Sequence, residues 1–145
     1  MNIIIAIMFF TTIMPNFNDN INNIINSKTE HRITSYYTGT ITADGTKIDY
    51  DKVLSGDDKF VAISQCSYMY KKYPYGSLIF INNINSFDPL IGGFYFVHDC
   101  TAKWVANKWP IGTIDILRHP TWDNQFREYS NVYLIFKGDG KREWN

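Results

Sequence analysis

Short apolar runs separated by turn residues fill the chain beyond residue 31. They are four or five residues long and lie at Phe60–Ile63, Leu78–Ile81, Phe94–Val97, Thr113–Leu117 and Val132–Phe136. Runs this short suit strands better than helices, although a buried helix segment can give the same pattern. Because several runs are continuously apolar rather than alternating, we expect strands that are covered on both faces, as in a compact barrel.

Two further stretches complete the predicted elements. Arg32–Ile41 alternates loosely and is rich in Thr, Tyr and Ile, which predicts a strand, and the Asp-Gly pair that follows predicts a turn. Thr121–Tyr129 is the one stretch typical of a helix, because its threonine can cap it and two of its aromatic residues share a face. The sequence therefore predicts a mainly β domain over residues 32–137, with six strands in a barrel and one or two short helices.

The segments outside this domain differ from it in composition. Ile3–Met14 is apolar, too short for a typical membrane span and typical of a signal-peptide core, but no basic residue precedes Lys28. A degenerate export signal and a truncated or mis-assigned start both remain open. We therefore divide the chain into an apolar segment (1–14), an Asn-rich linker with little reason to order (15–31), the barrel domain, and a polar tail (138–145).

Charge and cysteine content narrow the function classes. The chain has 14 basic and 14 acidic residues, so no overall positive charge draws it to nucleic acid, and we expect no nucleic-acid partner. Cys66 and Cys100 can form a disulfide or remain free thiols, and the sequence leaves both open. No metal-ligand spacing or cofactor motif stands out, so we expect neither a metal nor a cofactor.

The order of motifs along the chain carries a resemblance to a known family. The motifs are ITADGT (41–46), VAIS (61–64), YGSLIFI (75–81), GFYFVHD (93–99), TIDIL (113–117), and Phe126 with VYLI (132–135). This order resembles the double-psi β-barrel three-aspartate (3D) domain of MltA-type lytic transglycosylases, which is related to the RlpA-like and expansin barrels. The fold class that the resemblance implies is a six-stranded double-psi β-barrel.

The resemblance also implies a function and a location. Its members use a cleft on the barrel to bind a β-1,4-linked polysaccharide, usually peptidoglycan. In the catalytic members the aspartate of the TIDIL strand is the general acid/base, which is Asp115 here, and Asp99 supports it from the cleft floor. The implied location is extracellular or in the cell envelope, in a bacterial or phage-encoded protein without a stable membrane span.

The sequence departs from the family pattern in two places. Ser64 stands where the family often has an aspartate, and Cys100–Lys103 replaces a Thr-Gly-Gly sequence. The first removes one of the three named aspartates, unless Asp44 is counted in its stead, and the second alters the local loop geometry, which bears on catalytic competence. His98 adjoins Asp99, and in a regular strand it would point to the opposite face, so we interpret it as packed rather than catalytic.

Candidate substrate-binding residues are of two kinds, and each has a structural alternative. Aromatic rings can stack on sugar rings or cover one end of the barrel. Polar groups of the Asp-Gly turn can bind sugar hydroxyls or hold the turn. The candidates are Tyr36, Tyr37, Trp104 and Trp109 for stacking, and Thr42, Asp44 and Thr46 for hydrogen bonding.

A single aspartate is chemically sufficient for the implied reaction. Asp115 is flanked by Ile114, Ile116 and Leu117, and an apolar setting would raise its pKa and keep it protonated near neutral pH. Ordinary glycosidases need a second carboxylate, but a lytic transglycosylase uses the C6 hydroxyl of the sugar as nucleophile. The structural alternative is a buried aspartate that accepts backbone hydrogen bonds.

Three functions remain open from the sequence. The first is a peptidoglycan-cleaving lytic transglycosylase, which the retention of Asp99 and Asp115 favours. The second is a non-catalytic, expansin-like module that binds wall polysaccharide, which the two departures favour. The third is a phage structural protein that uses the barrel only as a scaffold.

Overall fold

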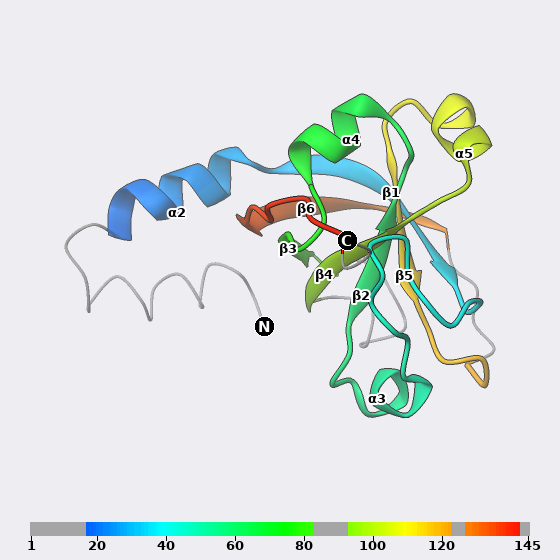
Figure 1. The fold of residues 1–145 in the computed structure, drawn as a ribbon. Coiled ribbons are helices and arrows are strands. Elements are labelled where there is room, and N and C mark those ends of the chain that lie inside the picture. Colours follow the sequence, from blue (N-terminus) through cyan, green and yellow to red (C-terminus); the bar gives the residue numbers. More distant parts are fainter. Residues whose placement is uncertain (1–16, 83–92, 123–126, 143–145) are drawn as a thin grey trace.

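Six strands close into a barrel in the computed structural model (Figure 1). The structure describes residues 17–82, 93–122 and 127–142. The strands are β1 (Thr29–Tyr36), β2 (Phe60–Ile63), β3 (Leu78–Ile81), β4 (Gly93–Cys100), β5 (Thr113–Leu117) and β6 (Glu128–Phe136). The helices are α2 (Phe17–Asn26), α3 (Tyr50–Ser55), α4 (Ser67–Lys72) and α5 (Lys103–Lys108). The predicted mainly β fold and closed six-stranded barrel are confirmed.

The barrel has mixed strand directions. Its order is β1-β5-β2-β4-β3-β6, in which β1 pairs with β5 and β2 with β4 in parallel, and the other neighbours are antiparallel. Parallel neighbours cannot be joined by a tight hairpin. Accordingly, only β3 and β4 are consecutive neighbours, and each other connection skips one strand. Residues far apart in sequence therefore meet on adjacent strands.

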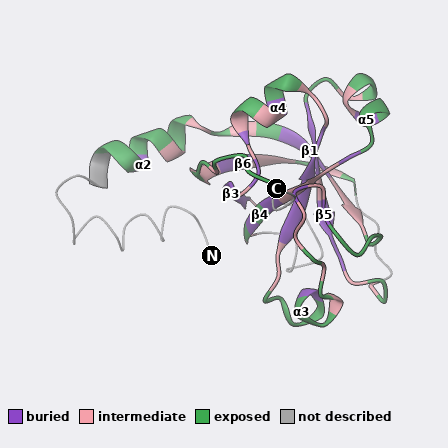
Figure 2. Ribbon diagram, in the orientation of Figure 1, coloured by how far each residue is buried: buried purple, intermediate pink, exposed green. Residues whose placement is uncertain are grey.

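All six strands contribute side chains to the barrel interior. The strand residues of this core are Ile33, Val61, Ile63, Ile79, Ile81, Tyr95, Val97, Ile114, Ile116 and Val132, and α4 and the turn after it add Met69, Tyr73 and Tyr75. Burial is concentrated in the strands, whereas the helices are mostly exposed (Figure 2). Burial of this apolar surface is the main stabilising contribution to the fold.

A second, smaller cluster explains why the apolar runs do not alternate. Phe60 and Leu117 lie on the outer face of the barrel and pack with Val53 of α3. The strand β2 is consequently buried along its whole length, with Val61 and Ile63 facing inward. The expected covering of strands on both faces is present here.

One extra residue interrupts the pairing of β4 with β2. Val61 pairs with Val97 and Ala62 pairs with Asp99, so His98 is the additional residue of a β-bulge. The side chains of His98 and Asp99 both reach the 42–46 turn. The expectation that they point to opposite faces is therefore wrong, because the bulge cancels the alternation of the strand.

The element boundaries differ from the sequence predictions in three places. The first strand begins at Thr29 and ends at Tyr36, rather than running from 32 to 41. The described residues contain four short helices instead of one or two. The predicted helix over 121–129 is wrong at its described ends, because Glu128 and Tyr129 belong to β6, where pairing with β1 outweighs local helix signals. Residues 123–126 of that prediction lie outside the described residues.

The Asn-rich stretch predicted as a linker contains α2. Ile21 is buried, and α2 packs against β6. The Ser27 hydroxyl donates to the carbonyl oxygen of Ile24 at 2.6 Å and accepts a hydrogen bond from the backbone N–H of Leu134 at 2.8 Å. These contacts give the segment the tertiary partners that its composition did not reveal. The apolar segment 1–14 lies outside the described residues.

Candidate functional site

A pocket of about 210 Å³ lies against the outer face of β1 and β5, beside α5. Its wall carries one carboxyl group, two guanidinium groups, two indole rings and several hydroxyl groups. The strands contribute Arg32, Thr34, Ser35, Thr113 and Asp115, and the remaining wall consists of Thr101, Trp104, Val105, Trp109 and Arg127. The candidate acid Asp115 and the two candidate stacking tryptophans are therefore brought together.

Asp115 faces away from the barrel interior because its neighbours Ile114 and Ile116 face into it. Its carboxyl oxygen Oδ1 accepts a 2.7 Å hydrogen bond from the hydroxyl of Thr34, its partner in the parallel β1–β5 pair. Burial raises the pKa of Asp115 above its usual range, although the Thr34 hydrogen bond and the charge of Arg32 oppose the rise. The group therefore keeps its proton to higher pH than an exposed aspartate.

Two arginines flank this carboxyl group. The Arg32 side chain is buried, with its guanidinium carbon 3.7 Å from the ring centroid of Trp109 and Nη1 3.5 Å from Oγ1 of Thr113. Arg127 is exposed at the pocket wall. Burial lowers the pKa of Arg32 and the charge of Arg127 adds to this effect, so the two cations repel each other.

The two indole rings line the pocket from the α5 side. Their centroids lie 6.0 Å apart, and Trp104 is 60% exposed, which leaves much of its ring open to solvent. Trp109 carries the guanidinium of Arg32 on its ring, so it is the more fixed of the two. Lys108 Nζ also lies 4.6 Å from the ring centroid of Trp109, so the ring that is open for stacking on a sugar is that of Trp104.

Gly112 closes the turn over residues 109–112, called the Trp109 turn below, and holds it close to the barrel. Its backbone N–H donates to the carbonyl oxygen of Trp109 at 3.0 Å, and its φ of +89° favours glycine. A Cβ here would lie 2.6 Å from Sδ of Met69 and 3.1 Å from Nδ1 of His31. No side chain therefore fits at this position without displacing the core beneath the pocket.

Asp99 lies on the same face of the barrel as Asp115 but two strands away, with Ala62 of β2 paired to both of them. Its oxygen atoms accept hydrogen bonds of 2.9 Å from the Tyr36 hydroxyl and from the backbone N–H groups of Ala43 and Cys100. Its negative charge contributes to the raised pKa of Asp115. Asp99 therefore acts on Asp115 electrostatically while it holds Tyr36 and the 42–46 turn in place.

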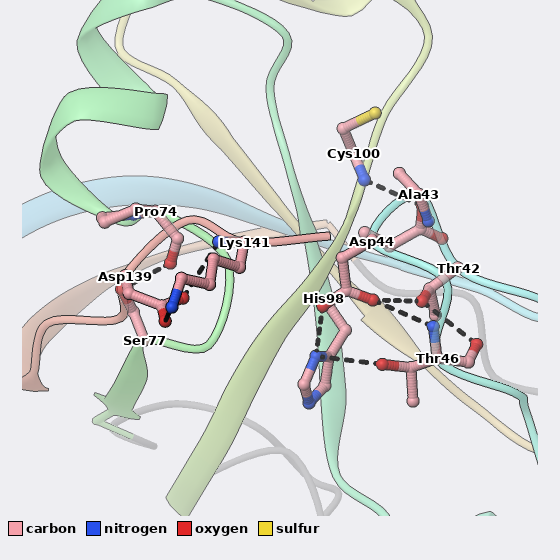
Figure 3. Close-up of polar contacts among 11 residues, drawn as sticks. Thr42, Ala43, Asp44, Thr46, Pro74, Ser77, His98, Cys100, Asp139 and Lys141 are labelled. Atoms are coloured by element: carbon pink, nitrogen blue, oxygen red, sulfur yellow. Dashed lines mark hydrogen bonds and ion pairs between the residues drawn. The ribbon is translucent and has the colours of Figure 1, made fainter. Parts of the chain in front are cut away.

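The candidate residues of the Asp-Gly turn bind one another and His98 (Figure 3). Asp44 accepts hydrogen bonds from Thr42 Oγ1 at 2.7 Å and from the Thr46 backbone N–H at 3.1 Å, and its Oδ2 lies 2.6 Å from Nδ1 of His98. Burial alone would raise the pKa of Asp44, but these hydrogen bonds outweigh it and leave the pKa below its usual range. None of Thr42, Asp44 and Thr46 lines the pocket.

The other predicted residues also lie away from the pocket wall. Tyr37 is 44% exposed after the end of β1. Cys66 and Cys100 are free thiols, and Sγ of Cys100 lies 3.1 Å from Nε2 of Gln65. Ser64, in the position of the missing aspartate, is buried and accepts a 2.7 Å hydrogen bond at Oγ from the backbone N–H of Thr113. It joins the end of β2 to Thr113 of β5, which lines the pocket.

Sequence reasoning missed the polar side chains of β1. Arg32 and Thr34 alternate with the core residue Ile33, so the sequence did place them on one face. The sequence does not reveal the parallel register, which sets Arg32 opposite Thr113 and Thr34 opposite Asp115. Arg127 is not signalled by any local pattern, because only the barrel brings it near Arg32.

Comparison of the chain with protein-family models, curated proteins and solved structures finds no match. Within the described parts of the chain, no group of three His, Cys, Asp or Glu side chains is placed to hold a metal ion. No helix among the described residues is long and apolar enough to cross a membrane. The case for a function therefore rests on the pocket around Asp115.

Proposed function

We propose that the protein is a lytic transglycosylase-like enzyme that cleaves β-1,4 glycosidic bonds of peptidoglycan, with Asp115 as the general acid/base. The observation that carries the proposal is the placement of a half-buried carboxyl group of raised pKa in one pocket with two tryptophan rings. A carboxyl group with a raised pKa can donate a proton near neutral pH. Tryptophan rings provide the apolar face on which a sugar ring stacks.

One carboxyl group can complete the proposed reaction without a second nucleophile. Protonated Asp115 gives its proton to the glycosidic oxygen as the bond to the anomeric carbon breaks. The C6 hydroxyl of the same sugar then attacks that carbon, and its proton returns to the Asp115 carboxylate. The products are a free sugar hydroxyl and a 1,6-anhydro sugar, so no water is consumed and Asp115 ends protonated.

Neighbouring groups support this role of Asp115. The Asp99 charge favours the protonated form of Asp115 before bond cleavage. The positive charge of Arg32 and the Thr34 hydrogen bond favour the carboxylate that forms during cleavage. Groups that favour each form of Asp115 therefore lie beside it, as suits a group that gives and regains one proton.

The barrel topology supports the double-psi assignment that we propose for the fold. It combines two parallel strand pairs with connections that skip a strand in a closed six-stranded barrel. By the same resemblance we propose an extracellular or cell-envelope location. The replacement of an aspartate by Ser64 favours a second candidate, an expansin-like module that binds wall polysaccharide without cleaving it.

Digestion of purified peptidoglycan tests the proposal. We expect wild-type protein to release anhydro-muropeptides, identified by mass spectrometry, and Asp115→Asn to release none while still pelleting with sacculi. Asp139→Asn is the matched control, because Asp139 is exposed in the C-terminal tail, and it should cleave as the wild type does. Pelleting of the wild type without any soluble product would support the binding module. If the wild type neither cleaves peptidoglycan nor pellets with sacculi, both wall functions are excluded.

A further inference from the structure

Among the described residues, neither arginine of the pocket forms a direct ion pair, although the charge of Asp115 acts on Arg32 from a greater distance. The Asp115 carboxyl group is hydrogen-bonded to Thr34 instead. The only described hydrogen bond of the Arg32 side chain is the 3.5 Å contact with the Thr113 hydroxyl. A guanidinium group has five N–H donors, so most of the donors of Arg32 are left for a ligand or solvent.

This arrangement is costly without a ligand. Arg32 is only 7% exposed, and burying a cation without a direct ion pair is unfavourable, even with the Asp115 charge nearby. Arg127 brings a second positive charge to the same wall and makes the burial of Arg32 less favourable still. An anion in the pocket would relieve both effects.

The orientation of Arg32 is fixed before any ligand binds. Its guanidinium lies 3.7 Å over the Trp109 ring, and the Trp109 turn is held by Gly112. Because the stack immobilises the planar fork, little side-chain entropy is lost when the fork binds a planar anion. A carboxylate matches the fork in two parallel hydrogen bonds.

We propose that Arg32 and Arg127 form a subsite for a carboxylate group carried by the glycan next to the sugar that stacks on Trp104. The inference rests on the proposed function for the identity of the ligand as a glycan. The charges agree with a monoanion: two guanidinium groups balance one ligand carboxylate and the Asp115 carboxylate that forms during the reaction. In peptidoglycan the matching group is the lactyl carboxylate of a muramic acid residue whose peptide has been removed.

A uronic acid also carries a carboxylate, because its C6 is a carboxylate carbon instead of a hydroxymethyl group. The two sources differ in their reaction with the enzyme, because a uronic acid has no C6 hydroxyl to attack the anomeric carbon. A uronic acid can therefore bind the subsite but cannot be the sugar that reacts. Measuring the affinity for each kind of glycan therefore distinguishes the two sources of the carboxylate.

Isothermal titration calorimetry on full-length Asp115→Asn protein, which prevents cleavage, tests the subsite. The probes are peptide-free glycan strands, the same strands with their carboxylates coupled to methylamine, a β-1,4-glucuronan tetramer, and cellotetraose. We expect the acidic strands to bind at least about tenfold more tightly than the methylamide strands. The protein could instead bind glucuronan more tightly than cellotetraose but bind acidic and methylamide strands equally. That result would assign the subsite to uronic acids instead of the lactyl group.

Substitutions in the same background show which cations are responsible. Arg127→Gln should remove most of the preference without affecting folding, because Arg127 is exposed. Arg32→Lys keeps the charge but loses the planar fork, and it should reduce the preference as well. Lys103→Gln is the matched control, because Lys103 is an exposed cation of α5 outside the pocket wall, and it should keep the full preference.

Two results would overturn the subsite. One is equal binding of acidic and methylamide strands, and the other is a preference that survives Arg127→Gln and Arg32→Lys. If wild-type protein still releases anhydro-muropeptides in either case, the subsite is wrong and the proposed function stands. Tight, arginine-dependent binding of acidic strands by a protein that cleaves nothing would support the subsite and contradict the enzyme.

Discussion

Oγ1 of Thr34 donates a 2.7 Å hydrogen bond to Oδ1 of Asp115 from the neighbouring parallel strand. The two residues are 81 positions apart in the chain, and the closed barrel makes them direct partners. The bond stabilises the carboxylate form of Asp115 against the effect of burial. The Thr34 hydroxyl therefore helps to set the pKa of the proposed acid.

Thr34→Val should change the pH dependence of the proposed reaction. The substitution removes the hydrogen bond at nearly constant volume, so the pKa of Asp115 rises further. Because Asp115 must be protonated to act as an acid, the alkaline limb of the profile of kcat/KM against pH should move to higher pH. Thr34→Ser retains the hydroxyl and should keep the wild-type limb. If the alkaline limb of the Thr34→Val profile lay at the wild-type pH, Asp115 would not be the group that titrates there.

Asp44→Ala should lower the free energy of unfolding by about 3 kcal/mol, because it leaves the buried Thr42 hydroxyl and two partly buried partners of the carboxylate unsatisfied. The lost contacts are those to Thr42, Thr46 and His98. Asp139→Ala is the control, since Asp139 is exposed and its contact with Lys141 is 3.5 Å long, and it should leave the stability essentially unchanged. Urea denaturation measures both. A stable Asp44→Ala protein with weakened glycan binding would instead favour a substrate-binding role for Asp44.

His31 should make the protein less stable in mild acid. Its side chain is fully buried, with Nδ1 3.0 Å from the Ile111 carbonyl oxygen and Nε2 2.9 Å from the Tyr73 hydroxyl. Burial lowers its pKa to about 4, against 6.5 for an unperturbed histidine. Above pH 6.5 the imidazole is neutral in both the folded and the unfolded chain, so its full contribution to stability is present there.

Between pH 6.5 and about 4 the unfolded chain binds a proton that the folded chain excludes. The free energy of unfolding should therefore fall by up to about 3 kcal/mol as the pH is lowered through this range. Urea denaturation at several pH values measures the slope. His31→Gln should reduce the slope, whereas the control His119→Gln should leave it unchanged. An equal slope in wild type and His31→Gln would show that His31 is not the group responsible.

Gly112→Ala should destabilise the protein by about 3 kcal/mol or more, because it adds a core clash to an unfavourable positive φ. The new Cβ would meet Met69 and His31. Gly56 provides a matched control, since its φ is +83° and nothing lies within 4 Å of an added Cβ. Gly56→Ala should therefore cost only about 1 kcal/mol, the backbone contribution alone. Equal losses in thermal or urea denaturation would show that the core accommodates the methyl group at 112.

The sequence predicted those parts of the fold that depend on local pattern. The runs at Leu78–Ile81 and Thr113–Leu117 coincide with β3 and β5, because a short apolar run between turns has few alternatives to a buried strand. The helices α4 and α5 were not predicted, since each has only six residues and makes no side-chain N-cap hydrogen bond that a sequence motif would reveal. Each helix buries one residue, Met69 in α4 and Val105 in α5, so tertiary burial rather than a local motif accompanies its helical form.

The candidate site was predictable in its tryptophans and its carboxyl group, but not in its cations. Asp115, Trp104 and Trp109 lie within twelve residues of one another, so one connection brings them together. Arg32 and Arg127 come from opposite ends of the domain and meet there only through strand pairing with β1. The bulge at His98 was equally hidden, because an extra strand residue leaves no trace in the apolar pattern.

The strand order has a consequence for how the chain folds during synthesis. β1 emerges first, but both of its partners, β5 and β6, lie in the last third of the barrel sequence. Until residue 117 has left the ribosome, β1 has neither of its partners, and its other edge stays unpaired until β6, which ends at residue 136, has also emerged. Contacts this distant in sequence slow folding and expose strand edges meanwhile. We therefore expect the barrel to close after synthesis of its last strand, in a single late step.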